Sequence, residues 1–192
     1  MNKIPIAIDN SILGDLVDLN LPDNKKEDNN SFLQIIELDH KGIFEIGIPI
    51  STTMIEESWA GNIKREAVRK KMGSAWRLWP VGATKKYNEM LDKQIDCLIK
   101  IMQDKGGIDS RNIIVSTIHS NYYLTTDYRY LRQFRAQLKR IREECGIKKE
   151  IFTPSEFLEK YNIKEIQVFP WINYFNRGKK NGKEKSMGNH TS

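Results

Sequence analysis

The sequence predicts an α/β protein in which helices cover both faces of a parallel sheet. Two observations support this fold class. Short apolar or β-branched runs alternate with longer segments of helical periodicity along most of the chain, as in strand–helix–strand units. The first run, 3–8, is apolar at most positions, which is typical of a strand buried on both faces. We therefore expect a three-layer α/β/α sandwich around a central parallel sheet.

The N-terminal half contains two of the expected strands, and Pro49 stops the second of them. Asn10 and Ser11 suit a helix cap because their side chains can accept hydrogen bonds from the first turn. The expected elements are a strand at 3–8, a helix at 12–19, a polar loop at 22–30, a short helix or irregular strand at 31–38, a strand at 42–48, a helix from Ser51 to Met72 and an aromatic loop at 73–84.

The C-terminal half carries the clearest helical patterns. The segment 112–120 has helical spacing but several β-branched residues, so a strand remains its alternative. Thr153, Pro154 and Glu156 have the order of a helix capping box. The expected elements are a helix at 87–102, a helix at 112–120, a strand at 122–126, a helix at 128–144 closed by Gly146, a strand at 150–152 and a helix from Thr153 to Tyr161.

The chain length limits the number of domains. With 192 residues there is room for one domain with a sizeable core and not for two. We assign residues 1–165 to this domain and 166–192 to a basic tail. From Arg177 onward the tail carries +4 of the net charge of +6, and it lacks apolar periodicity, so we expect it to be disordered. It is either a solvated end or a non-specific phosphate contact.

Composition and cysteine usage favour a soluble, cytoplasmic protein with no membrane partner. No apolar run approaches the roughly 18 residues that span a bilayer. Asp9 and Asp15 interrupt the N-terminal segment where a signal peptide would be apolar. Cys97 and Cys145 each lie in an expected amphipathic helix, without metal-ligand spacing. We expect both to be reduced core thiols rather than a disulfide or a catalytic pair.

Acidic residues stand at the ends of the expected strands or at the starts of the helices that follow. Because the carboxyl ends of parallel strands meet at one edge, these side chains can converge on one crevice. Carboxylates so close raise one another's pKa unless a cation lies among them, and Mg²⁺ or Mn²⁺ prefers oxygen ligands. Such an ion supports phosphodiester hydrolysis by polarising a phosphoryl oxygen and acidifying a bound water. The set comprises Asp9, Glu56, Glu57, Asp109 and Asp127.

Each acid also has a simpler interpretation. Asp9, Asp109 and Asp127 stand where a helix N-cap is common. Glu56 and Glu57 can favour the positive end of their helix dipole. Capping explains the combination less easily than it explains any single member.

Three motifs resemble the PIN-domain family of metal-dependent ribonucleases, which includes many toxins of toxin–antitoxin pairs. The run from Ile6 to Leu13 is similar to the family's opening strand, first aspartate and following small polar residue. The run from Ile50 to Glu57 is similar to its glutamate-bearing helix. Asp109 is followed eighteen residues later by Asp127, directly after Leu124-Thr125-Thr126, which resembles the family's order of aspartate, helix, strand and Thr-x-Asp. The resemblance covers residues 4 to about 161.

The resemblance implies a divalent-metal-dependent endoribonuclease that hydrolyses phosphodiester bonds of single-stranded or structured RNA. Its implied metal ligands are Asp9, Glu57, Asp109 and Asp127, which would hold Mg²⁺ or Mn²⁺. Its implied supporting residues are Ser11, Thr125 and Glu56. One departure concerns Arg129, which stands where many members carry an acidic or amide residue. The second departure is the loop around Trp76 and Trp79, which is longer than in compact toxins.

Basic and aromatic residues suit an RNA-binding surface. The helix after Asp127 carries a cationic ridge that begins with Arg129, Arg132 and Arg135, and this ridge contacts phosphates or is simply a solvated face. Trp76 and Arg77 stack on bases or pack under their loop. The expected partners are RNA, an antitoxin or ribonucleoprotein partner, and a second copy in a homodimer. The alternatives are a catalytically weakened PIN-like RNA-binding module and a structural partner protein.

Overall fold

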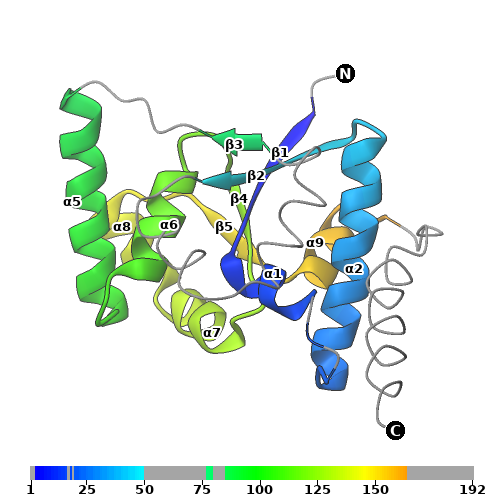
Figure 1. Cartoon of the computed structure of the whole chain (residues 1–192). Coiled ribbons are helices and arrows are strands. Elements are labelled where there is room, and N and C mark those ends of the chain that lie inside the picture. Colours follow the sequence, from blue (N-terminus) through cyan, green and yellow to red (C-terminus); the bar gives the residue numbers. More distant parts are fainter. Residues whose placement is uncertain (1–2, 17, 19, 50–76, 80–84, 164–192) are drawn as a thin grey trace, which may run out of the picture.

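A parallel sheet of five strands forms the centre of the molecule in the computed structural model (Figure 1). The structure describes residues 3–16, 18, 20–49, 77–79 and 85–163. The strand order is β3-β2-β1-β4-β5, and every neighbouring pair is parallel. The strands are β1 (Ile4–Ile8), β2 (Phe44–Pro49), β3 (Arg77–Trp79), β4 (Tyr122–Leu124) and β5 (Glu150–Phe152).

Helices pack on both faces of this sheet and form two separate hydrophobic clusters. The first cluster receives side chains from α1 (Asn10–Asp15), α2 (Asp23–His40) and α9 (Pro154–Lys160). The second receives side chains from α5 (Lys85–Met102), α6 (Ile108–Ser116), α7 (Tyr128–Ala136) and α8 (Leu138–Cys145). The expected three-layer α/β/α sandwich is therefore confirmed.

The two central strands supply side chains to both clusters by simple alternation. Ile6 and Ile8 of β1 and Leu124 of β4 belong to the first cluster. Ala7 and Tyr123, which are paired across the two strands, belong to the second. Since successive side chains of a strand point to opposite faces, both faces of these strands are buried, and their apolar character in the sequence follows from this burial.

Several sequence-based expectations for individual elements are confirmed. The strands at 4–8, 44–49, 122–124 and 150–152 lie within a few residues of their predicted positions. The segment 112–120, whose pattern fits a helix or a strand, belongs mostly to α6. Thr153 and Glu156 form the predicted capping box at the start of α9. Gly146 ends α8 in a left-handed conformation with φ 68°, which glycine adopts without steric cost.

The segment 22–30, expected to be a polar loop, is instead the first part of α2. Asp28 is only 3% exposed and accepts hydrogen bonds from the Tyr128 hydroxyl and from the backbone N–H and hydroxyl of Ser155. These donors belong to α7 and α9, so contacts from other elements stabilise this helical start. The segment 31–38, for which the pattern left helix and strand open, continues the same helix and buries Phe32 and Ile35.

Two further expectations were wrong in detail. The predicted aromatic loop at 73–84 contains β3, which pairs with β2. The predicted helix at 128–144 is two helices, α7 and α8, that meet at Gln137, where φ is −102° and ψ is 6°. No glycine or proline stands at this position, so the local sequence gives no breaker signal for the interruption.

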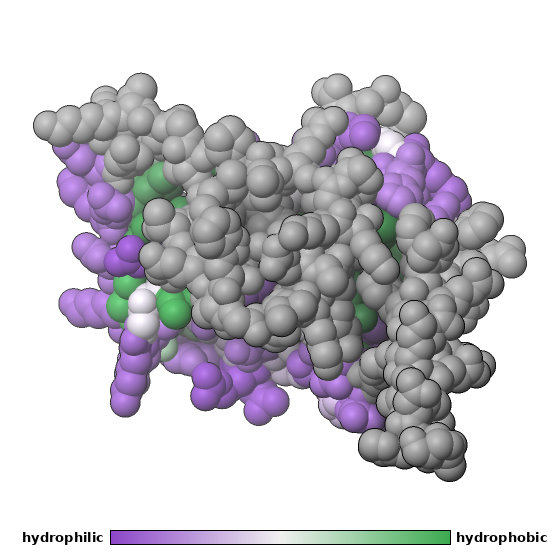
Figure 2. Space-filling view, viewed as in Figure 1, coloured by the Kyte–Doolittle hydropathy of each residue, from purple (hydrophilic) through white to green (hydrophobic). Residues whose placement is uncertain are grey.

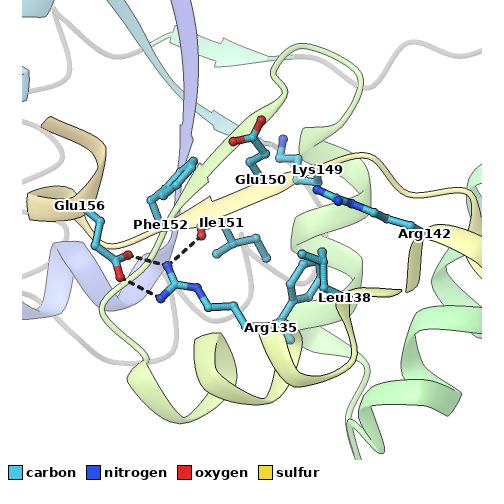
Figure 3. Close-up of a pocket in the computed structure, with 9 residues that line it drawn as sticks. Arg135, Leu138, Arg142, Lys149, Glu150, Ile151, Phe152 and Glu156 are labelled. Carbon is cyan, nitrogen blue, oxygen red and sulfur yellow. Dashed lines mark hydrogen bonds and ion pairs between the residues drawn. The ribbon is translucent and has the colours of Figure 1, made fainter. Parts of the chain in front are cut away.

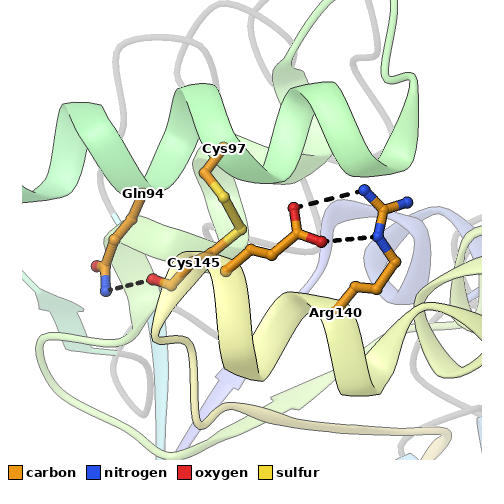
Figure 4. Close-up of a disulfide and its surroundings, with 5 residues drawn as sticks. Gln94, Cys97, Arg140 and Cys145 are labelled. Atoms are coloured by element: carbon orange, nitrogen blue, oxygen red, sulfur yellow. Dashed lines mark hydrogen bonds and ion pairs between the residues drawn. A yellow bond between two sulfur atoms is a disulfide. The ribbon is translucent and has the colours of Figure 1, made fainter.

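The two cysteines form a disulfide, contrary to the expected reduced thiols (Figure 4). Cys97 of α5 and Cys145 of α8 are 48 residues apart in sequence, and their Cα atoms are 5.7 Å apart, within the usual range for a disulfide. Both cysteines lie on the apolar stripes of helices that cover the same sheet face. The packing of α5 against α8 brings these two stripes together. The spacing of the two cysteines in the sequence does not reveal this contact.

The outer surfaces of the flanking helices are hydrophilic where Figure 2 shows them. On α5, for example, Asp92, Lys93 and Asp96 are exposed, whereas Leu91 and Leu98 are buried. Within the described part of the chain, no helix combines the length and apolarity that crossing a bilayer requires.

Candidate metal-binding crevice

The strand order creates a topological switch point, the candidate crevice, at the carboxyl ends of β1 and β4. β1 lies between β2 and β4, so the chain continues to one side of β1 for β2 and β3 and to the other side for β4 and β5. Open α/β sheets bind ligands at such a switch point, outside the carboxyl ends of the strands. Ile8 pairs with Leu124, and Asp9 and Thr125 are the residues that directly follow this pair.

Asp9 is a buried carboxylate in this crevice, with 8% of its surface exposed. Its Oδ1 accepts hydrogen bonds from the Asn10 backbone N–H at 2.7 Å and the Tyr123 hydroxyl at 3.0 Å. Its Oδ2 accepts from the hydroxyls of Ser11 at 2.6 Å and Thr125 at 2.8 Å. Four donors therefore occupy the roughly four acceptor positions of an ionised carboxylate. Asp9 is also the N-cap of α1, as its simpler interpretation predicted.

Ser11 and Thr125 connect Asp9 to the segment that follows β4. The Ser11 hydroxyl oxygen lies 3.2 Å from that of Thr125 and accepts from the Thr126 backbone N–H at 3.1 Å. The Thr125 hydroxyl oxygen accepts from the Asp127 backbone N–H at 3.0 Å. Two of the three residues predicted to support the site, Ser11 and Thr125, thus lie in one hydrogen-bonded network with Asp9.

Asp127 begins α7 at the same end of the sheet. Its Oδ1 accepts from the Tyr130 backbone N–H at 3.0 Å and caps the helix. Its Oδ2 accepts no hydrogen bond from the residues that the structure describes. The side chain is partly exposed, so one oxygen of Asp127 caps the helix and the other is not used by the described part of the fold.

Asp109 lies in the first turn of α6, and it acts on the same buried tyrosine as Asp9. Burial, followed by the charges of Asp9 and Asp109, raises the pKa of Tyr123 well above its ordinary value. Burial is also the main reason why the pKa of Tyr130 is raised, and Asp109 and Asp9 again contribute. Asp9 and Asp109 are 100 residues apart in sequence, yet the charges of both act on Tyr123 and Tyr130.

Tyr123 is a site residue that sequence reasoning missed. It is 2% exposed, and its raised pKa keeps the phenol protonated, so it donates to Asp9. A signal was present, because a tyrosine in a strand buried on both faces must find a partner for its hydroxyl. The identity of that partner depends on the register of β4 against β1.

A second layer of polar contacts holds the segment after β4 against α1 and α2. The Thr126 hydroxyl donates to Asp15, which also accepts from the Lys25 ammonium at 3.0 Å. Tyr128 donates to Asp28. These contacts fix the backbone that carries Thr125 and Asp127, although the sequence alone indicates no such role for the residues that make them.

Part of the predicted site lies outside the described residues, and one of the predicted RNA-binding arginines is engaged in an ion pair. Glu56, Glu57 and Trp76 lie outside the described residues, and Arg77 is described only by its backbone in β3. The first three members of the predicted cationic ridge differ in their availability. Arg129 and Arg132 are exposed, whereas Arg135 forms an ion pair with Glu156 at 2.5 Å.

The described carboxylates suit a hard divalent cation in chemistry but do not complete a site for one. Carboxylate oxygens are preferred ligands of Mg²⁺ and Mn²⁺, and Asn10 has a buried side-chain oxygen that accepts no hydrogen bond from described residues. Against this, both oxygens of Asp9 are occupied by protein donors. No three His, Cys, Asp or Glu residues in the described chain lie close enough together to hold a metal ion. Further ligands would have to come from outside the described residues.

The fold and this crevice define an open parallel α/β protein with an acidic switch-point crevice. Comparisons with family models, with curated proteins and with solved structures found no match to this chain. A function for the chain must therefore be inferred from the geometry of the crevice and the chemistry of its residues.

Proposed function

We propose that this chain is a PIN-like endoribonuclease that depends on Mg²⁺ or Mn²⁺ and hydrolyses phosphodiester bonds of RNA. The observation that carries the proposal is the hydrogen-bonded group of Asp9, Ser11 and Thr125 at the β1–β4 switch point, with Asp127 beginning the next helix. Asp109 supports it because its charge acts on Tyr123, the tyrosine that donates to Asp9. The proposal requires Glu57 as a further ligand.

Each described residue has a definite part in this proposal. Asp9 supplies a buried carboxylate, Asp109 a partly exposed one, and Asp127 offers the carboxylate oxygen that does not cap α7. Ser11 and Thr125 hold the Asp9 carboxylate in one orientation through hydrogen bonds. A bound cation would polarise the scissile phosphate and lower the pKa of a coordinated water. One hydroxyl donor would have to turn away from Asp9 to leave an oxygen free for the cation.

Arg129 and Arg132 provide the contacts to RNA on either side of the cleaved bond. Both are exposed on α7, directly after Asp127, and neither forms an ion pair with a described residue. Arginine at such a position neutralises phosphate charge without reading sequence. Trp76 and Arg77 remain proposed base-stacking residues, and an antitoxin, a ribonucleoprotein partner or a second copy remains a proposed partner in the cytoplasm.

A second candidate function is RNA binding without cleavage. The specific observation in its favour is that Asp9 already accepts four hydrogen bonds from the protein, so its charge is satisfied without a cation. Arg129, where many PIN-domain members have an acidic or amide residue, points the same way. In this interpretation the crevice network stabilises the fold, and the cationic surface of α7 performs the function.

The two functions are separated by calorimetric titration with Mn²⁺ combined with an assay of cleavage of a mixed-sequence single-stranded RNA. The parent chain is compared with Asp9→Asn and Asp127→Asn. Asparagine caps a helix as well as aspartate does, so Asp127→Asn removes a charged ligand and keeps the start of α7. Asp18→Asn is the matched control, because Asp18 is exposed and accepts only from the Asn20 backbone N–H among the described contacts.

Metal binding and cleavage by the parent, with both lost in the two crevice variants and kept in Asp18→Asn, would support the ribonuclease. RNA binding without metal binding or cleavage would support the second function. A parent chain that neither binds Mn²⁺ nor retains RNA would refute both.

A further inference from the structure

A cavity lies on the β5 side of the sheet, away from the acidic crevice (Figure 3). Its volume is about 400 Å³, which is within the usual size range of small-molecule sites. The lining residues come from α7, α8, β5, α9 and the position just before β5, and none of them belongs to the crevice network. They are Phe134, Arg135, Leu138, Arg142, Lys149, Glu150, Ile151, Phe152 and Glu156.

The floor of this pocket is apolar. Phe134 and Ile151 are buried members of the second hydrophobic cluster, and Leu138 packs against that cluster. Figure 3 shows Leu138 and Ile151 directed toward one another between α8 and β5. A flat apolar group of a ligand would therefore rest on side chains that are already held in place by the core.

The charges around the pocket are not balanced. Glu156 receives two hydrogen bonds from the Arg135 guanidinium, which also donates to the Ile151 carbonyl oxygen at 3.3 Å. Glu150 forms an ion pair with Lys160 at 2.5 Å. Both acids of the lining are thus neutralised by a cation. Arg142 and Lys149 form no ion pair with any acid in the described part of the chain.

Arg142 and Lys149 lie close to each other at this pocket. Arg142 is exposed on α8, and its guanidinium extends toward Lys149 (Figure 3). Lys149 is 2% exposed, and its ammonium donates to the Ser120 carbonyl oxygen at 2.6 Å. Burial lowers the pKa of Lys149 well below its ordinary value, as is usual for a buried cation without a counter-ion. The exposed guanidinium of Arg142 therefore places at the mouth of the pocket a positive charge that no ion pair with a described acid neutralises.

We propose that this pocket binds a small organic anion, with an apolar ring on Phe134, Leu138 and Ile151 and a carboxylate or phosphate group on Arg142. The guanidinium presents a planar fork that matches the oxygens of either anion. Lys149 lies buried in the wall beside Arg142 and donates a hydrogen bond to the Ser120 carbonyl oxygen. This binding site does not depend on the nuclease proposal, because no crevice residue takes part in it.

Amide chemical shifts of the full chain, followed during titration, test the proposal with four probes. Phenyl phosphate and benzoate carry a ring and an anion, benzylamine carries the same ring and a cation, and inorganic phosphate carries the anion alone. We expect saturable shifts at Leu138, Arg142 and Ile151 with phenyl phosphate or benzoate, and the stronger of the two identifies the preferred anion. Inorganic phosphate should bind more weakly because it leaves the apolar floor uncovered.

Two charge reversals on α8 provide the control. Arg142→Glu should weaken binding of the preferred anion by about tenfold or more, which corresponds to ~1.4 kcal/mol. Lys139→Glu makes the same change in net charge at an exposed residue of α8 that does not line the pocket, and it should change affinity by less than about twofold. Benzylamine binding as tightly as benzoate, equal binding of inorganic and phenyl phosphate, equal losses in both variants, or no shift with either ring-bearing anion would overturn the proposal.

Discussion

Two buried charged residues lie at opposite ends of the sheet and differ in how well the protein satisfies them. Asp9, at the carboxyl end of β1, accepts four hydrogen bonds. Lys149, just before β5, donates to one carbonyl oxygen. Burial of a charge is costly unless hydrogen bonds or an opposite charge compensate it. Asp9 is therefore part of what holds β1, β4 and α1 together, whereas Lys149 costs stability unless something outside the described chain offsets it.

The largest expected effect is at Asp9. Asp9→Ala should lower the free energy of unfolding by about 3–5 kcal/mol, because three hydroxyl donors lose an ionic acceptor at ~1–3 kcal/mol each. Urea unfolding measures the change. Asp18→Ala removes an exposed carboxylate and should cost less than about 0.5 kcal/mol. Similar values for the two variants would show that the crevice network contributes little to stability.

The second largest expected effect is that of removing the disulfide between α5 and α8. Cys97→Ser together with Cys145→Ser should lower the free energy of unfolding by about 2–4 kcal/mol, because the cross-link restricts a long loop of the unfolded chain. The parent in reducing buffer should match the double variant. If reductant leaves the thermal midpoint of the parent unchanged, the two helices are held together by packing alone.

Lys149→Met is expected to stabilise the protein at neutral pH by about 1–2 kcal/mol, since an apolar side chain of similar length replaces a buried ammonium. Loss of the hydrogen bond to Ser120 limits the gain. Lys148→Met is the matched control, because Lys148 is the exposed neighbour. Thermal or urea unfolding of the three chains gives the comparison, and a destabilised Lys149→Met would mean that the ammonium has a partner that offsets its burial.

The stability difference between Lys149→Met and the parent should also depend on pH. The folded pKa of Lys149 lies below its ordinary value of 10.5, so between these two values the unfolded parent binds more protons than the folded parent. The stability of the parent therefore rises with pH across this window, and the advantage of Lys149→Met shrinks. Below the folded pKa the advantage should be constant. Urea titrations at several pH values measure it, and a pH-independent difference would contradict the assignment.

The smallest expected effect concerns the tyrosine that donates to Asp9. Tyr123→Phe should cost about 1 kcal/mol, which is typical of one buried hydrogen bond. Tyr130→Phe should cost less, because its hydroxyl lies 3.5 Å from the Ser110 hydroxyl oxygen, compared with 3.0 Å between Tyr123 and Asp9. Thermal unfolding of both variants decides the order. Equal costs would indicate that hydroxyl burial, rather than the contact with Asp9, sets the effect.

Much of the fold was predictable because it depends on local patterns. The apolar run of β1, the helical stripe of α5 and the capping box of α9 each lie within a few residues of their predicted positions. The crevice was predictable in part for the same reason. Asp9 directly follows β1 and Thr125 directly follows β4, and parallel neighbours bring such residues to one edge. To predict that Asp9, Ser11 and Thr125 meet, it was enough to know the order of the elements and that β1 pairs with β4.

Other features depended on contacts that local sequence does not encode. The start of α2 is polar, and donors from α7 and α9 hold its buried Asp28. Lys149 resembles its exposed neighbour Lys148 in sequence, yet only Lys149 is buried. The four donors of Asp9 come from two parts of the chain, the start of α1 and the end of β4, so the segment around Asp9 reveals only half of its hydrogen bonds.

The amino-acid sequence by itself determined the alternation of strands and helices, the apolar faces that cover the sheet, and the placement of acidic residues after the strands. It does so because helical and extended backbones present side chains with fixed periods. The tertiary structure alone decided which side chains meet: Cys97 with Cys145, Tyr123 with Asp9, and Lys149 with a carbonyl oxygen rather than an acid. Those pairings follow from strand register and helix packing, which bring together residues far apart in the chain.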